Sequence, residues 1–209
     1  MLLSVSGASG VGKSTVLAAL RERDFGAPVV GVEFDSIGVP ADADTSWRHG
    51  AIEHWVRVAI DAQAEGKHVL LCGQVPPGEL LAAPSAPLLD GIAVCVLTAS
   101  AETQRSRLIA RGEDAEGLLH HLRFGAWFAA HAADPAHLPE VIRVPSAVPM
   151  VWERWEGWEA GDERWPVTIL DTDALGAEEV ANRVESWARD ALVGAARAID
   201  RRGRAGHPS

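Results

Sequence analysis

Short apolar runs alternate along the chain with longer stretches in which hydrophobic residues recur at helical spacing. A run such as HVLLC, at 68–72, is nearly continuous in apolar residues. That pattern is typical of a strand buried on both faces of a parallel sheet. The stretches between the runs carry hydrophobic residues every three or four positions, as amphipathic helices do. This alternation predicts an α/β fold built on a parallel sheet. The expected strands are 2–6, 28–34, 68–72, 92–97 and 167–170.

Helical periodicity covers 12–23, 46–65 and 177–200. About seventy residues separate the fourth expected strand from the fifth, and those from 101 to 161 are mainly helical in pattern. A plain crossover between parallel strands needs only about a dozen residues. We therefore expect a crossover helix followed by a helical insertion or lid at about 112–161. Residues 1–200 are expected to form one domain, with a flexible polar tail at 201–209.

Composition adds limits and one anomaly. The chain has 209 residues, 47% of them hydrophobic, and a net charge of −10. This balance argues against a broad nucleic-acid-binding surface, which needs clustered Lys and Arg. No run approaches the roughly 18 apolar residues of a membrane span, so a cytoplasmic protein without a membrane segment is expected. Lysine is almost absent, since only Lys13 and Lys67 occur among the 19 basic residues. A retained ammonium at Lys13 indicates a function there.

The segment 7–14, GASGVGKS, matches the pattern GxxxxGK[ST] at every position. An apolar strand precedes it and a helical stretch follows it, which is the context that the pattern requires. Backbone N–H groups of such a loop converge on an anion, and the start of the helix adds a positive dipole end. We therefore predict a nucleoside-triphosphate site in which Lys13 reaches the β- and γ-phosphates and Ser14 binds Mg²⁺. The residues expected to bind the nucleotide in this segment are Gly7, Ala8, Ser9, Gly10, Val11, Gly12, Lys13, Ser14 and Thr15.

With this motif, the chain resembles the small P-loop kinases, such as the shikimate, gluconate, nucleotide and antibiotic kinases and the chloramphenicol phosphotransferase-like enzymes. The resemblance implies a three-layer α/β/α fold with the strand order 2-3-1-4-5. It also implies ATP and Mg²⁺ as cofactors and a mobile, arginine-bearing lid after the fourth strand. Larger P-loop proteins fit less well, because the chain has no LSGGQ-like signature and no NKxD motif for reading a guanine base.

Asp35 follows the second expected strand. Ligands of open α/β sheets bind beyond the carboxyl ends of the strands, so Asp35 is a candidate to accept a substrate hydroxyl proton or to hold Mg²⁺. In the resembling kinases an Asp followed by Ser has this part; the alternative is an ordinary turn residue. The third strand lacks the terminal Asp that is usual in this superfamily. Gln74, just beyond it, is either a substrate contact or a loop residue, and Arg48 lies where related kinases place substrate-binding helices.

Arginines mark the expected lid. Arg107 and Arg111 are four residues apart, which places them on one helix face, and a guanidinium can bind phosphate oxygens or stack on a base. Arg123 lies further into the lid and is a candidate to close over the γ-phosphate. The alternative is a solvated basic face paired with neighbouring glutamates. After the last strand, Asp171 and Thr172 resemble residues beside the nucleotide base, or they cap the following helix.

A tryptophan-rich segment alternates with glutamates and has two interpretations. Core packing or a dimer contact is the first, and an aromatic, acidic wall for a cationic or planar substrate is the second. Four histidines show no ligand spacing and are expected at the surface or with satisfied hydrogen bonds. The tryptophans are Trp152, Trp155, Trp158 and Trp165, and the histidines are His120, His121, His131 and His137.

Together these features predict a phosphotransferase that moves the γ-phosphoryl of ATP to a hydroxyl group of a small molecule, acting as a monomer or a homodimer. Two alternatives are open: a nucleoside or nucleotide kinase, and a nucleotide-binding switch protein that hydrolyses ATP without a small-molecule acceptor. The missing carboxylate after the third strand favours the switch protein. Asp35 and the arginines of the expected lid favour the kinase.

Overall fold

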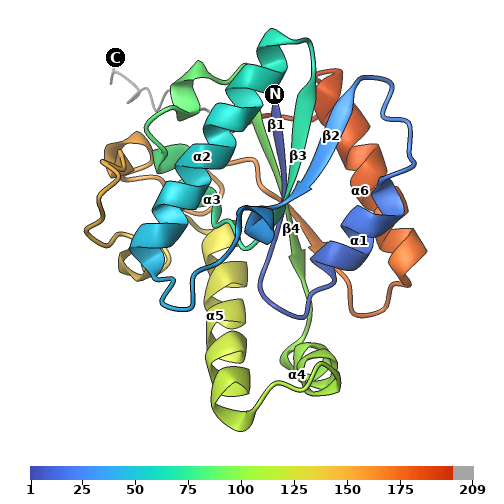
Figure 1. Ribbon diagram of the computed structural model, residues 1–209, viewed down its shortest axis with the longest axis vertical. Coiled ribbons are helices and arrows are strands. Elements are labelled where there is room, and N and C mark those ends of the chain that lie inside the picture. Colours follow the sequence, from blue (N-terminus) through green and yellow to red (C-terminus); the bar gives the residue numbers. More distant parts are fainter. Residues whose placement is uncertain (200–209) are drawn as a thin grey trace.

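The computed structural model describes residues 1–199, and its centre is a parallel sheet with the strand order β2-β3-β1-β4-β5 (Figure 1). This architecture confirms the predicted α/β fold class and the strand order that the resemblance implied. The strands are β1 (Leu2–Ser6), β2 (Val29–Glu33), β3 (His68–Gly73), β4 (Ile92–Thr98) and β5 (Thr168–Asp171).

The continuous apolar runs form the middle of this sheet. Leu3 of β1 lies opposite Leu70 of β3 and Ala93 of β4, and all three side chains are buried. The edge strands β2 and β5 are partly exposed. Because β1 is central, the loop after it emerges in the middle of the carboxyl edge of the sheet. That edge is where ligands of such folds bind.

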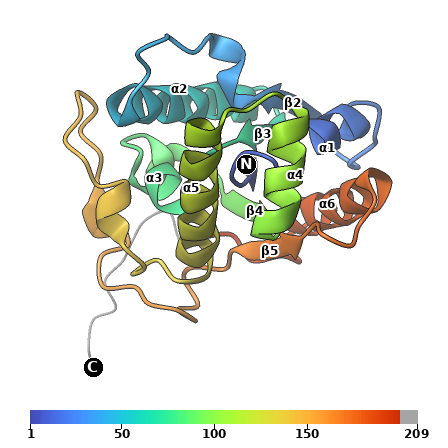
Figure 2. The same cartoon turned by 90° about the horizontal axis from the view of Figure 1, so that it is seen from below.

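Helices cover both faces of the sheet. Helices α1 and α6 pack with one hydrophobic core, and α2, α3 and α5 pack with the other (Figure 1). Helix α4 lies beside α5, as Figure 2 shows, and both extend beyond the carboxyl edge of the sheet. The helices are α1 (Lys13–Leu20), α2 (Thr45–Ala64), α3 (Pro77–Ala82), α4 (Ala101–Ala110), α5 (Ala115–Ala133) and α6 (Ala177–Leu192).

The helical pattern expected through residue 161 ends at Ala133. The segment from there to β5 is mostly irregular and holds only short 3-10 turns, at Pro139–Val141 and Trp152–Arg154. Prolines recur through it at 135, 139, 145 and 149. Proline lacks the N–H that an α-helix needs, so this stretch does not continue the helix. Among the tryptophans, Gly157 and Gly161 have positive φ angles of 74° and 83°, which an α-helix does not contain. The last helix also ends earlier than expected, at Leu192, and its expected final residue and the predicted tail at 201–209 lie outside the described residues.

The tryptophans of this segment pack into the core. Trp155 is 1% exposed and donates a hydrogen bond from Nε1 to the carbonyl of Gly78 at 2.9 Å. Trp165 is 6% exposed and donates to the carbonyl of Ala132 at 2.9 Å. The indoles therefore fasten the irregular segment to α3 and α5. Core packing, rather than a wall for a substrate, is the interpretation that this burial supports.

His131 departs from the expectation of a surface or satisfied histidine. It is fully buried, and its ring stacks on Trp127 at a centroid distance of 5.0 Å. The rings of Trp155 and Trp165 lie edge-on to it. Neither ring nitrogen has a hydrogen-bond partner within the part of the chain that the structure describes. Burial lowers the pKa of His131 to about 4.

Among the helices of residues 1–199, none combines the length and the apolar character that crossing a membrane requires.

Candidate functional site

The loop between β1 and α1 is shaped by glycines in conformations that other residues avoid. Gly7, Gly10 and Gly12 have φ angles of 143°, 84° and 102°. A Cβ atom on Gly7 would lie 2.4 Å from the carbonyl oxygen of Leu97 in β4, far inside contact distance. The loop therefore follows the sheet closely, and its turns require glycine at these positions.

The amino end of α1 is open toward solvent. Gly12 is its N-cap, and no side chain among residues 1–199 forms a capping hydrogen bond there. The first turn contains no acidic residue, and Ser14 and Thr15 are exposed. The N–H groups of a first helical turn have no partner within the helix, so this end is suited to bind an anion.

Lys13 is partly buried, and its ammonium folds back into the loop. Its Nζ donates a hydrogen bond to the carbonyl of Ala8 at 2.7 Å. Loss of hydration lowers the pKa of Lys13 to about 8, with a smaller effect in the same direction from Arg111. The nearby carboxylate of Asp35 acts in the opposite direction. A cation is therefore held, poorly hydrated, at the floor of the site.

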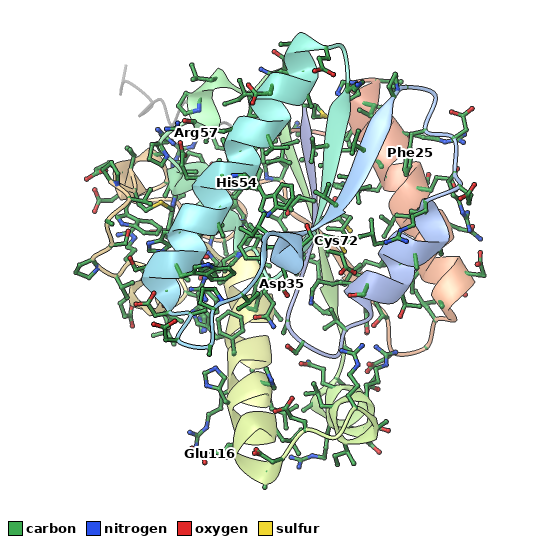
Figure 3. All side chains as sticks on the ribbon, viewed as in Figure 1. Phe25, Asp35, His54, Arg57, Cys72 and Glu116 are labelled. Atoms are coloured by element: carbon green, nitrogen blue, oxygen red, sulfur yellow. The ribbon has the colours of Figure 1, made fainter. Side chains whose placement is uncertain are left out.

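A pocket of about 730 Å³ opens in front of this loop, between the ends of β2 and β3 and the facing parts of α2 and α5. Asp35 lies in the short 3-10 helix Phe34–Ile37, directly after β2, and Figure 3 labels it between α2 and α1. The structure thus brings together predicted residues from well-separated parts of the chain. Those that line the pocket are Ser9, Lys13, Ser14, Asp35, Arg48, Gln74 and Arg111.

Gln74 and Arg48 have protein partners within this pocket. The Gln74 side chain donates from Nε2 to the hydroxyl of Ser9 at 2.6 Å. This hydrogen bond connects the end of β3 to the loop between β1 and α1. Arg48 binds the Glu79 carboxylate with Nε at 2.9 and 3.0 Å and with Nη2 at 2.7 Å. Glu79 is fully buried and also lies 3.3 Å from Nε2 of His49. Glu79 was not predicted as a site residue, although a single acid at the start of the stretch ELLAA was an available signal.

Arg107 and Arg111 do not share one environment, contrary to the shared face expected from their spacing. Arg107 donates from Nη1 to the carbonyl of Gly10 at 3.1 Å and to the hydroxyl of Thr172 at 3.4 Å. Arg111 lies just beyond the last residue of α4, where the helical path ends, and lines the pocket instead. Arg107 therefore fastens the loop to the end of β5.

Asp171 and Thr172 lie outside the pocket. The Thr172 hydroxyl donates to the carbonyl of Thr98 at 3.0 Å, and the Asp171 carboxylate accepts a hydrogen bond from the N–H of Asp173 at 3.0 Å. Both residues serve the turn after β5 rather than capping α6, whose N-cap is Gly176.

Helix α5 contributes side chains to the pocket, but not the predicted one, Arg123. Arg123 is exposed and is not among the residues that line the pocket. His120, His121 and Phe124 on the same helix do line it. No spacing signal marks these histidines in the sequence, because their place in the pocket depends on how α5 packs over the end of the sheet.

The described residues hold no group of three or more His, Cys, Asp or Glu side chains that could bind a metal ion by themselves. Ser14 and Asp35 offer oxygen atoms on two sides of the same pocket. Hard divalent cations prefer oxygen donors and, in the case of Mg²⁺, keep several waters or use oxygens of a bound phosphate. This sparse set of donors therefore suits a cation that arrives together with a phosphate ligand.

Comparison with protein-family models and with curated protein sequences gives no match. Solved structures do share the fold. They include APE1195, at 14% identity and a TM-score of 0.55, with 92% of this chain and 96% of that one covered. A sugar kinase from Janibacter sp. HTCC2649 has 15% identity and a TM-score of 0.52, with 89% and 92% covered. The tunicamycin resistance protein of Deinococcus radiodurans has 15% identity and a TM-score of 0.50, with 95% and 98% covered. At identities this low, the likeness shows a shared fold alone.

Proposed function

We propose that this protein is a phosphotransferase that uses ATP and Mg²⁺ to phosphorylate a hydroxyl group of a small molecule. The observation that carries the proposal is the shared pocket of Lys13 and Asp35. A phosphate-binding loop alone would suit any nucleotide-binding protein. A carboxylate in the same pocket could act on a second substrate, and the volume of about 730 Å³ leaves room for one beside the phosphates. The sugar kinase with the same fold supports this reaction class.

The loop fits the phosphates of a nucleotide. Its glycine turns leave no space for Cβ atoms at Gly7 and allow backbone N–H groups to face an anion. The open amino end of α1 adds a positive dipole end, and the Lys13 ammonium can leave the Ala8 carbonyl to bind phosphate oxygens. When bound beside Ser14, Mg²⁺ neutralises charge on the β- and γ-phosphates.

Asp35 is assigned the acceptor side of the reaction. As the acceptor hydroxyl oxygen forms its bond to the γ-phosphorus, the Asp35 carboxylate accepts the hydroxyl proton. The bond from the γ-phosphorus to the β,γ-bridging oxygen breaks, and its electron pair leaves with ADP. Lys13 and the loop N–H groups bind the charge that develops on ADP, while Arg111 binds the transferred group.

One observation favours the alternative of an ATP-hydrolysing switch protein. Strand β3 ends at Gly73, and the following residue is Gln74, so no carboxylate stands where larger P-loop proteins hold their metal through water. The kinase proposal accounts for this with Ser14, Asp35 and phosphate oxygens as the cation ligands. The kinase proposal also gives a role to the part of the pocket that the phosphates do not fill. A switch protein does not need an acceptor site there.

ADP release in the presence of candidate acceptors tests the proposal. Nucleosides, sugars, aminoglycosides and other hydroxyl-bearing antibiotics are screened for stimulation. With an active acceptor, we expect Asp35→Asn to lower transfer about 100-fold or more, because general-base catalysis typically contributes at least that factor. Asp42→Asn, an exposed site in the loop before α2, is the matched control and should leave transfer unchanged. Full activity in Asp35→Asn would refute the assigned base. Stimulation by a protein partner alone would favour the switch.

A further inference from the structure

The pocket has two chemically different ends. Lys13, Ser14 and Arg111 lie at the end that faces the loop and the end of α4. The opposite end, between α2 and α5, is lined by the aromatic side chains of Phe34, Trp47 and Phe124. If the first end binds the phosphates, the second is left for the acceptor. Its composition therefore limits what the acceptor can be.

The aromatic side chains form a preorganised apolar wall. Phe34 is 2% exposed and packs edge-to-face against Trp47, with centroids 5.9 Å apart and planes at 81°. Its carbonyl accepts a hydrogen bond from Nε1 of Trp55 at 3.0 Å, which fixes the backbone at the end of β2. Phe124 packs on Trp127 at 5.3 Å. Rigid aromatic surfaces of this kind favour a flat, apolar portion in a ligand.

Arg48 is the cation nearest to this wall, and the fold neutralises it. Its guanidinium lies 5.9 Å from the centroid of Phe124 and gives its Nε and Nη2 hydrogens to the buried carboxylate of Glu79. Two-pronged pairs of this kind are strong and directional. An acceptor carboxylate that took the Nε and Nη2 hydrogens would leave the buried Glu79 with His49 as its remaining neighbour, which is costly. Glu79 therefore offsets most of the attraction that the charge of Arg48 would exert on an anion.

Carboxylates add further negative charge to the pocket as a whole, and two of them, Glu33 and Asp35, also act on Lys13. Glu33, Asp35 and Asp44 line the pocket. The Asp44 carboxylate also accepts the hydrogen bond from the N–H of Trp47 that caps α2. His121 lies 3.4 Å from the Glu113 carboxylate, which offsets any charge it carries. With Lys13 and Arg111 committed to the nucleotide phosphates, an anionic acceptor would meet repulsion.

We propose that the acceptor is a neutral or cationic hydroxyl compound with a flat apolar ring, and that the pocket discriminates against carboxylates and phosphate monoesters. Glu33 and the Arg48–Glu79 pair set this preference, Trp47 and Phe124 receive the ring, and the buried Phe34 supports Trp47. The proposal rests on the phosphotransferase function, because the nucleotide is what occupies the cationic end. The reaction at the hydroxyl is the one already written, with the proton passing to Asp35.

Three compounds with one skeleton test the charge preference: 3-phenyllactate, its methyl ester and phenylalaninol. Their dissociation constants are measured by calorimetry on protein saturated with Mg²⁺ and β,γ-methylene-ATP. We expect the ester and phenylalaninol to bind about tenfold or more tightly than the carboxylate, as a single charge in a partly desolvated pocket would dictate. Equal or tighter binding of the carboxylate overturns the proposal, as does absence of binding by all three. Failure of the nucleotide analogue to bind is a separate result, which refutes the phosphotransferase function itself.

Variants locate the preference. Glu33→Gln removes an exposed carboxylate from the pocket and should lower the ratio of the carboxylate's dissociation constant to that of the ester by about threefold. The control variant Glu22→Gln, at an exposed site after α1, should leave this ratio unchanged. Glu79→Gln frees the charge of Arg48 and should tighten carboxylate binding, provided that near-UV circular dichroism shows a native fold. If Glu79→Gln does not fold, the ratio of dissociation constants measured with Glu33→Gln tests the assignment by itself. An unchanged preference in Glu33→Gln contradicts the assignment.

Discussion

Lys13 illustrates how a single residue is prepared for a ligand that it does not yet bind. Its ammonium is partly buried and has the Ala8 carbonyl as its hydrogen-bond partner, so it is poorly hydrated. A phosphate that enters the loop supplies the anionic partner that the buried ammonium lacks. This arrangement explains why lysine is retained here in a chain that otherwise carries arginine at almost every basic position.

The lowered pKa of Lys13 predicts a pH dependence of nucleotide affinity. The nucleotide binds the ammonium form, which the free protein already holds below its pKa of about 8. Above that value binding must take up a proton, so the affinity should fall by up to about tenfold per pH unit. Calorimetry from about pH 7 to about pH 9.5 measures this. The slope should vanish in Lys13→Met, and an affinity of the wild-type protein that stays constant over this range would contradict the prediction.

At the residue scale, the sequence predicted what is local and missed what is paired at a distance. Lys13 and Ser14 belong to one short motif whose spacing alone defines a geometry. Arg48 was identified as a candidate, but its partner Glu79 lies 31 positions further along the chain. No spacing rule connects a residue of α2 with one of α3. Only the packing of the two helices shows that this arginine is neutralised.

The loop after β1 is the element on which the site depends, and its closeness to β4 can be tested by substitution. Gly7→Ala combines a φ of 143° with a Cβ that would lie 2.4 Å from a backbone oxygen. We expect it to lower the free energy of unfolding by at least about 3 kcal/mol. Gly26→Ala has a similar sign of φ, 74°, but open space around the Cβ, and should cost only about 1 kcal/mol. Urea unfolding measures both, and equal losses would contradict the proposed close approach.

At the scale of elements, local sequence patterns predicted the strands but not the segment before β5. The middle strands are buried on both faces, so their apolar runs were unambiguous. The segment after Ala133 was predicted to be helical as part of 101–161, but it is mostly irregular. Its actual path follows from prolines and from hydrogen bonds of Trp155 and Trp165 to the backbone of other elements. Such long-range anchoring leaves no periodic signal.

At the scale of the whole molecule, two hydrophobic cores flank the sheet, and the one on the side of α2, α3 and α5 contains the buried His131. This core supports both the irregular segment and the helices that line the aromatic end of the pocket. A titratable group buried on this side of the sheet ties the stability of that side to pH.

His131 predicts a loss of stability in acid. Its pKa is about 4 in the folded protein against 6.5 for an ordinary histidine, so the unfolded chain binds the proton more tightly. The full contribution to stability is present above about pH 6.5 and is lost as the pH falls toward 4, by up to about 3 kcal/mol. Urea unfolding across this range measures it. His131→Phe should reduce the slope by about one proton, and an unchanged slope would contradict the assignment.

The central claim is that the loop from Gly7 to Ser14 binds ATP through Lys13, and the second lysine of the chain provides a matched control. Lys67 is exposed after α2 and pairs with Glu65, away from the pocket. Calorimetric titration of ATP with Mg²⁺ compares the wild-type protein with Lys13→Met and Lys67→Met. We expect the dissociation constant to rise about 10- to 100-fold in Lys13→Met, as the loss of a charged hydrogen bond to phosphate implies, and to stay unchanged in Lys67→Met. Equal affinities in the two variants would contradict the claim.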